Sequence, residues 1–218
     1  MDGMTGYNPD LVREDLNRFN EAITEIYNYA KTEFDNYNKG LLDAWCSPKA
    51  LELSRGGGTP SDCGLFYGCW IGDDLAELQK EIVASASGAT KLIARANGDE
   101  FTYDYTQLSF DTFDYVKLKE KGPNGEVGMN HILVDMIVSQ YVGSCNKVAA
   151  LIKNLPVDLH IYDPGGALTA AFKERITKTA DIFTSTVEAV VRVVNEIKEQ
   201  EQDHLTMGVN NAVQTMAG

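Results

Sequence analysis

The sequence has no apolar run long enough to cross a bilayer, because it nowhere approaches the roughly 20 uninterrupted apolar residues of a spanning helix. Near its beginning it carries Asp10, Glu14, Asp15 and Glu21 where a signal peptide has a basic start and an apolar core. We therefore expect neither membrane insertion nor a cleaved signal peptide. Two locations stay open: secretion without a cleaved leader, and the cytoplasm.

Basic side chains are also scarce. The chain of 218 residues has 19 Lys and Arg against 32 Asp and Glu, which gives a net charge of −13. Such a surface repels the phosphates of nucleic acids and of anionic membranes. We expect no nucleic-acid partner. The hydrophobic fraction of 44% is nevertheless ample for a buried core.

Histidine is represented by 3 residues, and the sequence offers no catalytic constellation. Glu201 and His204 have the i, i+3 spacing of one half of a carboxylate-bridged di-metal site, but no second such pair is evident. A solvated helix end is the simpler interpretation. The glycine run 56–58 lacks the Lys and Ser or Thr that complete a phosphate loop. We expect no cofactor, no metal, no catalytic residues and no enzymatic activity.

The 4 cysteines are too few for a small disulfide scaffold, although three lie near one another in sequence. These three, Cys46, Cys63 and Cys69, could form a disulfide outside the cell. The alternative is that they are part-buried thiols, since free cysteine packs as a small hydrophobe. Both interpretations stay open.

Long amphipathic helices dominate what is present. From Leu11 to Trp45 the apolar residues recur at intervals of three and four, which is the spacing of one helix face. Three further patterns predict helices that run from Asp73 or Asp74 to Asn97–Gly98, from after Gly128 to Pro156, and from Ala167 to about Leu205. The last residues, 209–218, are interpreted as a frayed tail. The predicted fold is mainly α, an elongated bundle of four long helices.

An aromatic segment separates the second and third predicted helices. Between Phe101 and Lys119, aromatic and polar residues alternate, which predicts either a small β-hairpin or an extended arm. Tyrosine and phenylalanine provide large contact areas at low entropic cost, so this segment is a candidate partner surface. Its candidate residues are Tyr103, Tyr105, Phe110, Phe113 and Tyr115. We expect one helical domain over 1–218, with a subdivision into 1–98, 99–128 and 129–218.

A turn motif ends the first predicted helix. Its residues are Trp45, Ser47, Pro48, Ala50 and Leu53. The segment 11–53 resembles the helix–turn–helix centre of the WXG100 family, the small helical proteins of type VII secretion. Trp45 matches the family's Trp, Ser47 takes the place of its Gly, and Ala50 and Leu53 match the small and apolar positions that follow. The chain would be a long or duplicated relative.

The resemblance implies leaderless export, dimerisation through helix seams as a homodimer or heterodimer, and a role as a secretion substrate or as its partner. Our first hypothesis is therefore a non-enzymatic helical protein that acts through protein–protein contacts in type VII secretion. The alternative is a cytoplasmic structural or adaptor bundle, for instance of phage or mobile-element origin.

Overall fold

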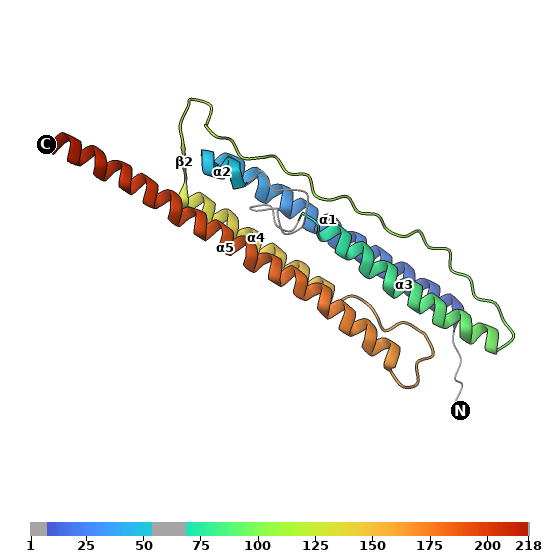
Figure 1. The fold of residues 1–218 in the computed structure, drawn as a ribbon. Helices are drawn as coiled ribbons and strands as arrows, with labels where there is room; N and C mark the ends of the chain where they lie inside the picture. The colour runs from blue at the N-terminus through green and yellow to red at the C-terminus, as the bar shows by residue number, and fades with distance from the viewer. Residues whose placement is uncertain (1–7, 54–68, 218) are drawn as a thin grey trace. The chain divides into compact units, whose positions relative to one another are not determined.

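The computed structural model describes residues 8–53 and 69–217. In this part of the chain, five helices and two short strands follow one another (Figure 1). The prediction of a mainly α fold is confirmed. The helices are α1 (Pro9–Ala44), α2 (Pro48–Leu53), α3 (Ile71–Ala96), α4 (His131–Lys153) and α5 (Ala167–Ala217), and the strands are β1 (Trp45–Cys46) and β2 (Gly128–Met129).

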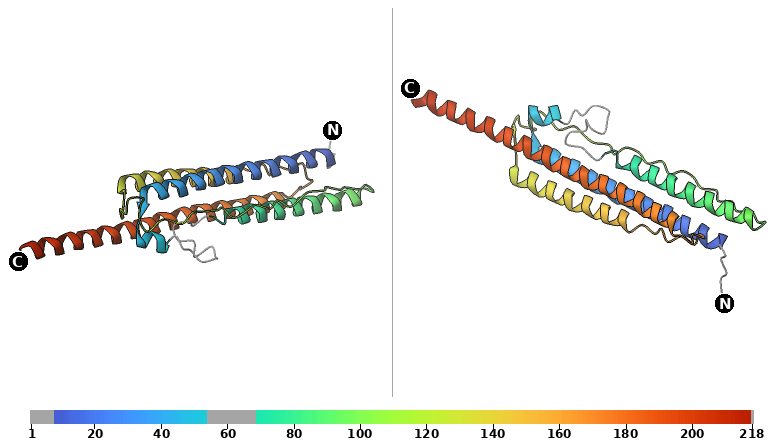
Figure 2. Two further views of the ribbon diagram at one scale, coloured as in Figure 1. Left: turned by 90° about the horizontal axis from the view of Figure 1, so that it is seen from above. Right: turned by 60° about the horizontal axis from the view of Figure 1, so that its bottom comes forward.

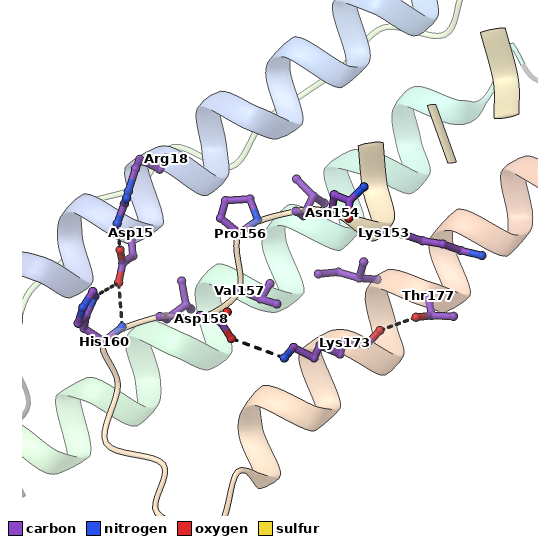
Figure 3. A pocket seen from close by; sticks show the side chains of 13 residues that line it. Asp15, Arg18, Lys153, Asn154, Pro156, Val157, Asp158, His160, Lys173 and Thr177 are labelled. Atoms are coloured by element: carbon purple, nitrogen blue, oxygen red, sulfur yellow. Dashed lines mark hydrogen bonds and ion pairs between the residues drawn. The ribbon is translucent and has the colours of Figure 1, made fainter. Parts of the chain in front are cut away.

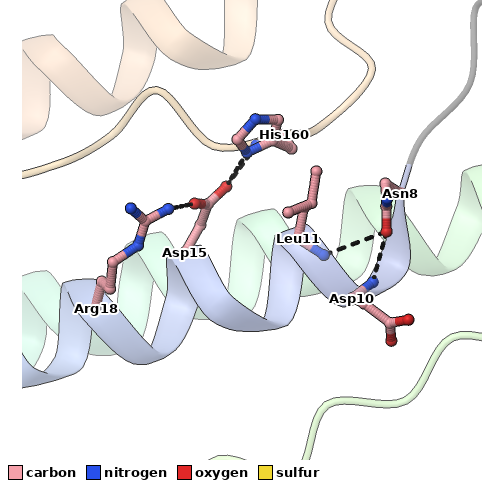
Figure 4. Close-up of polar contacts among 6 residues, drawn as sticks. All are labelled: Asn8, Asp10, Leu11, Asp15, Arg18 and His160. Carbon is pink, nitrogen blue, oxygen red and sulfur yellow. Dashed lines mark hydrogen bonds and ion pairs between the residues drawn. The ribbon is translucent and has the colours of Figure 1, made fainter.

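Helix α1 begins at Pro9, two residues before the apolar pattern that starts at Leu11. The Asn8 Oδ1 atom accepts hydrogen bonds from the backbone N–H groups of Asp10 (3.1 Å) and Leu11 (3.3 Å), as Figure 4 shows. Pro9 occupies the first helical position, where the N–H that it lacks would have no partner within the helix.

Helix α5 differs from the prediction, because it continues past Leu205 to Ala217. Residues 206–217 contain no proline and Gly208 as their one glycine, so no residue forces the helix to end earlier. The expectation of a frayed tail is wrong for the described residues of this segment.

The aromatic segment is an extended arm. None of residues 99–118 belongs to a helix or strand, so of the two alternatives for this segment the hairpin is wrong. The arm lies along α1 through polar contacts. Tyr103 donates its phenolic O–H to Asn17 (2.7 Å) and accepts from the Asn20 amide (3.1 Å). Further along, the Asn38 side chain bonds both the N–H (2.8 Å) and the C=O (3.0 Å) of Val116.

The chain divides into two compact units, each built from three separate segments. Unit 1 comprises 1–32, 70–113 and 145–184, and unit 2 comprises 33–69, 114–144 and 185–218. Helices α1, α4 and α5 each contribute one part to either unit. These units cross the boundaries at 98 and 128 that divide the sequence into consecutive parts.

The core of unit 1 contains α1, α3 and α5. Its apolar side chains come from positions three and four apart on each helix, as the amphipathic patterns predicted. Gln79 of α3 is fully buried and satisfied, because its amide donates to Asn20 (2.9 Å) and accepts from the Leu108 N–H of the arm (3.3 Å). The buried apolar residues include Val12, Leu16, Phe19, Ile23, Leu75, Leu78, Ile82, Phe172, Ile176, Ala180 and Phe183.

The core of unit 2 contains parts of α1, α4 and α5. Tyr37 of α1 stacks on Tyr141 of α4, with ring centroids 4.2 Å apart and planes inclined by 15°. A Cβ atom at Gly40 would lie 3.1 Å from the Ile137 side chain, so glycine permits the close approach of α1 and α4 at this point. The other buried residues of this core include Phe34, Leu41, Val134, Val187, Val190, Val194 and Ile197.

Candidate functional site

The turn motif of unit 2 is built on a short antiparallel pairing. Trp45 pairs with Met129 and Cys46 with Gly128, which joins the end of α1 to the residues just before α4. Ser47 then caps α2, since its hydroxyl oxygen accepts the Ala50 N–H at 2.9 Å and Pro48 occupies the first helical position. Ser47 therefore has a local structural role at the start of α2.

A buried carboxylate of α5 binds this turn. The Trp45 indole N–H donates to both Oε1 and Oε2 of Glu201 at 3.1 Å, and the Ser47 hydroxyl donates to Oε1. We call Trp45, Ser47, Ala50 and Glu201 the Glu201 cluster. Trp45 is 1% exposed and Glu201 8%. The interpretation of Glu201 as part of a solvated helix end is wrong, although His204 one turn further on is exposed.

The candidate residues of the turn motif have different surroundings. Ala50 is fully buried and Ser47 nearly so, whereas Pro48 is exposed. Leu53 ends α2, and its side chain lies outside the described residues. A hollow of about 350 Å³ beside the cluster is lined by Pro48, Val127, Glu201 and His204 among others.

The structure describes two of the three cysteines of the candidate disulfide, Cys46 and Cys69. Cys63 lies outside the described residues. Cys46 is half-buried and its thiol donates to the Glu126 carbonyl oxygen at 3.4 Å, while Cys69 is buried. The choice between a disulfide and thiols stays a prediction.

One residue of the candidate partner surface on the arm is buried in the structure. Phe113 is 2% exposed and its ring lies 5.6 Å from that of Tyr27, so it belongs to the core of unit 1 and its assignment to a partner surface is wrong. Phe110 stacks on Tyr27 at 4.1 Å. Tyr103, Tyr105, Phe110 and Tyr115 are half-buried.

The segment of α5 beyond Glu201 is exposed at its described side chains. Within unit 2, Trp45 marks the end of α1 at the level of Glu201, and Asp135 near the start of α4 pairs with Lys198. Residues 202–217, which we call the α5 extension, continue past this level (Figures 1 and 2). All of its described side chains from Gln202 to Met216 are exposed.

Unit 1 contains a second buried carboxylate, on α1. Asp15 is 4% exposed, and its Oδ2 atom accepts from the His160 backbone N–H (2.8 Å) and lies 2.7 Å from His160 Nδ1, while Oδ1 pairs with Arg18 (Figures 3 and 4). Burial raises the pKa of Asp15, but the hydrogen bonds from His160 and Arg18 together hold its pKa below the ordinary value of 3.8. This contact fastens the linker after α4 to α1.

A hollow of about 690 Å³ adjoins Asp15 (Figure 3). Each Lys or Arg side chain that lines this hollow forms an ion pair with a carboxylate. The pairs are Arg18 with Asp15, Lys153 with Asp181 (3.1 Å) and Lys173 with Asp158 (3.5 Å). The pairs leave little net charge to select an anionic ligand. We assign no ligand to this hollow.

Within residues 8–53 and 69–217, no three His, Cys, Asp or Glu side chains gather where they could hold a metal ion. No helix in these ranges combines the length and apolarity needed to cross a bilayer. The expectations of no cofactor and no enzymatic activity stay predictions.

No protein family, curated protein or solved structure matches this chain. The sites are therefore interpreted from their own geometry. The partners of Asp15 and Glu201 were not predicted from the sequence. The spacing nevertheless places both carboxylates on the apolar face of their helices, because Asp15 follows Val12 by three residues and Glu201 follows Ile197 by four. A charged residue at a seam position predicts a buried polar contact.

The Asp15 contact predicts a specific pH dependence of stability. Because the folded-state pKa of Asp15 is lowered, its stabilising effect is complete above the unfolded-state pKa and is lost as pH falls through the folded-state pKa. We expect Asp15→Asn to lower the free energy of unfolding at pH 7 by about 2 kcal/mol, with the difference from wild type vanishing at low pH. Urea unfolding between pH 2 and 7 measures this.

Asp10→Asn is the matched control, because Asp10 also pairs with an arginine three residues on (Arg13, 2.7 Å) but its side chain is 84% exposed. We expect a change below about 0.5 kcal/mol for that variant. Equal effects of the two substitutions would contradict the assignment of a stabilising role to Asp15.

Proposed function

We propose that this chain is a non-enzymatic helical protein that acts through protein–protein contacts, as a long or duplicated WXG-like protein of type VII secretion. In this proposal its long helices pack as one elongated bundle. It is exported by the secretion system or accompanies a protein that is. The α5 extension is the observation that carries the proposal.

The α5 extension has the properties of a helix that packs on a partner. Isolated helices of about 15 residues are marginal in water, and most helical stability in proteins comes from tertiary packing. This segment includes Gly208 and the β-branched residues Thr206, Val209 and Val213, which have modest helix propensity. Packing against another protein would supply the stabilisation that its own sequence does not.

Exposed apolar side chains support the same conclusion. Of the eleven large hydrophobic residues exposed in the described part of the chain, eight belong to unit 2. Exposed apolar surface marks a protein interface where it is contiguous, as along Val209, Val213 and Met216 of the α5 extension. These eight are Val116, Val127, Ile132, Met136, Met207, Val209, Val213 and Met216.

The turn motif supports the link to the WXG-like group. In the resemblance, the Trp and the small residue two places on shape the turn between two helices. Here Trp45 and Ser47 both bind Glu201 through their side chains. The turn is therefore held to α5, the helix that carries the exposed segment.

Export is the direct test of this function. We expect the native chain to be found in the culture supernatant of its source cells and to be lost from it when the membrane ATPase of the secretion system is deleted. Immunoblotting of supernatant and cell fractions measures this, with a cytoplasmic enzyme as the control for lysis. Retention in the cells of both strains would contradict the proposal and favour the cytoplasmic structural or adaptor bundle.

A further inference from the structure

We infer that the α5 extension, residues 202–217, binds the same segment of a second copy of this chain in an antiparallel helix pair. The inference rests on the proposed function, because it names the partner of the surface that carries it. Three properties of the segment lead to this partner: its exposure, its apolar stripe and the absence of Asp, Glu, Lys and Arg from residue 204 onward. The orientation follows from the separation that antiparallel packing gives two acidic chains.

The exposure of the extension is large and continuous. Val209 is 62% exposed, Val213 58% and Met216 89%, whereas Val190, Val194 and Ile197 earlier in α5 are buried. Transfer of each of these apolar side chains from water into a packed contact would lower the free energy. A second copy packed on this face would cover them.

Four apolar residues of the extension form a stripe along one face. Val209, Ala212, Val213 and Met216 follow the i, i+3, i+4, i+7 spacing that places side chains along one side of a helix. Asn211 and Gln214 lie on the opposite side by the same 3.6-residue period. Met207 lies on that side too. The stripe itself has the form of a helix–helix contact surface.

The absence of charge indicates a second copy rather than a charged partner. The chain carries a net charge of −13, yet residues 204–218 contain no Asp, Glu, Lys or Arg, the longest such run in the sequence. Two copies repel each other over most of their surface, but this segment meets its own copy without bringing like charges together. A partner with a charged contact helix would instead have to bury its charges without counter-ions.

The polar groups beside the stripe also suit an identical partner. Gln202 and Thr206 are neutral, and each can both donate and accept a hydrogen bond. In an antiparallel pair centred on Val209 they lie opposite Met216 and Ala212 of the second copy, so neither brings a charge against the stripe. A symmetric contact of one patch with itself is the commonest geometry of protein dimers.

Antiparallel packing follows from the remaining charge. In a pair centred on Val209, the two Glu201 residues lie about 24 Å apart along the helix axis, at 1.5 Å per residue. The screening length is about 8 Å at physiological ionic strength, so repulsion between the acidic parts of the two chains is largely screened. A parallel pair would bring the two Glu201 residues and their surroundings side by side.

Sedimentation velocity of the full chain over 1–100 μM at physiological salt tests the pair. We expect wild type to be a dimer and Val209→Asp/Val213→Asp to weaken dimerisation by about 100-fold, because two apolar residues leave the contact and like charges enter it. The matched control is Asn211→Asp/Gln214→Asp, which adds the same charge to the opposite face. It should change the dissociation constant by less than about threefold.

The substituted residues are exposed in the single chain, so the thermal unfolding midpoint at concentrations where all variants are monomers should stay unchanged. A monomeric wild type at 100 μM would overturn the inference. So would a dimer that survives Val209→Asp/Val213→Asp, or a control variant that dissociates equally.

Cross-linking tests the orientation. Gln202→Cys and Met216→Cys chains should form intermolecular disulfides when mixed, but little when each is oxidised alone, since residues 202 and 216 lie opposite each other in an antiparallel pair centred on 209. Wild type under the same oxidation controls for the native cysteines. Efficient self-cross-linking of Gln202→Cys would contradict antiparallel packing. Export is measured separately, so a monomeric chain that is still exported would overturn the pair and leave the proposed function intact.

Discussion

Replacing Trp45 by alanine should lower the free energy of unfolding by about 4 kcal/mol. Trp45 is among the largest fully buried side chains in the described residues, at 1% exposed, so its removal leaves a cavity at the junction of α1, β2 and α5 within unit 2. The substitution also removes the indole N–H that donates to both oxygens of Glu201. Urea unfolding followed by far-ultraviolet circular dichroism measures the change.

Trp45→Phe separates the two effects. Phenylalanine keeps much of the apolar volume but has no N–H to donate, so we expect a loss of about 1–2 kcal/mol. A Trp45→Ala variant within about 1 kcal/mol of wild type would show that the turn contributes little to folding, which contradicts the packing described for unit 2.

Replacing Glu201 by alanine should cost about 3 kcal/mol, because the buried Trp45 N–H and Ser47 O–H both lose their acceptor. The hydroxyl of Ser47 also caps α2, so the effect should extend to that helix. Glu201→Gln retains one acceptor oxygen and should lose about half as much. The same urea unfolding experiment measures both.

Glu199→Ala is the control for Glu201, since Glu199 lies two residues away on the same helix and is exposed. We expect a change within about 0.5 kcal/mol. A Glu201→Ala variant no less stable than Glu199→Ala would refute the role of the Glu201 cluster. A double-mutant cycle with Trp45→Phe and Glu201→Gln should give a coupling energy above about 0.5 kcal/mol, as expected for residues in direct contact.

The local part of the fold was predictable from periodicity. Val12, Leu16, Phe19 and Ile23 were expected on one face of the first helix, and all four are fully buried. Amphipathic spacing is a property of neighbouring residues, so it can be recognised without knowing what the face packs against. The start of α1 at Asn8 and Pro9 depends on equally local hydrogen bonding.

Other features depended on contacts that no local pattern contains. Alternation between Phe101 and Lys119 suits both a hairpin and an arm, and the decision for the arm came with the contacts of Tyr103 and Val116 to α1. The end of α5 was misplaced because small and polar residues tolerate the helix without requiring it.

The sequence by itself determined that this chain is mainly helical, where most of its helices begin, which helix faces are apolar and that its charge is strongly acidic. These properties follow from residue type and from spacing within a few turns. The tertiary structure decided which groups hydrogen-bond to the two buried carboxylates, Asp15 and Glu201. His160 lies 145 residues from Asp15, and Trp45 lies 156 residues from Glu201. A carboxylate on a helix seam signals that a partner is needed, but the chain must fold before a donor so distant in sequence can be identified.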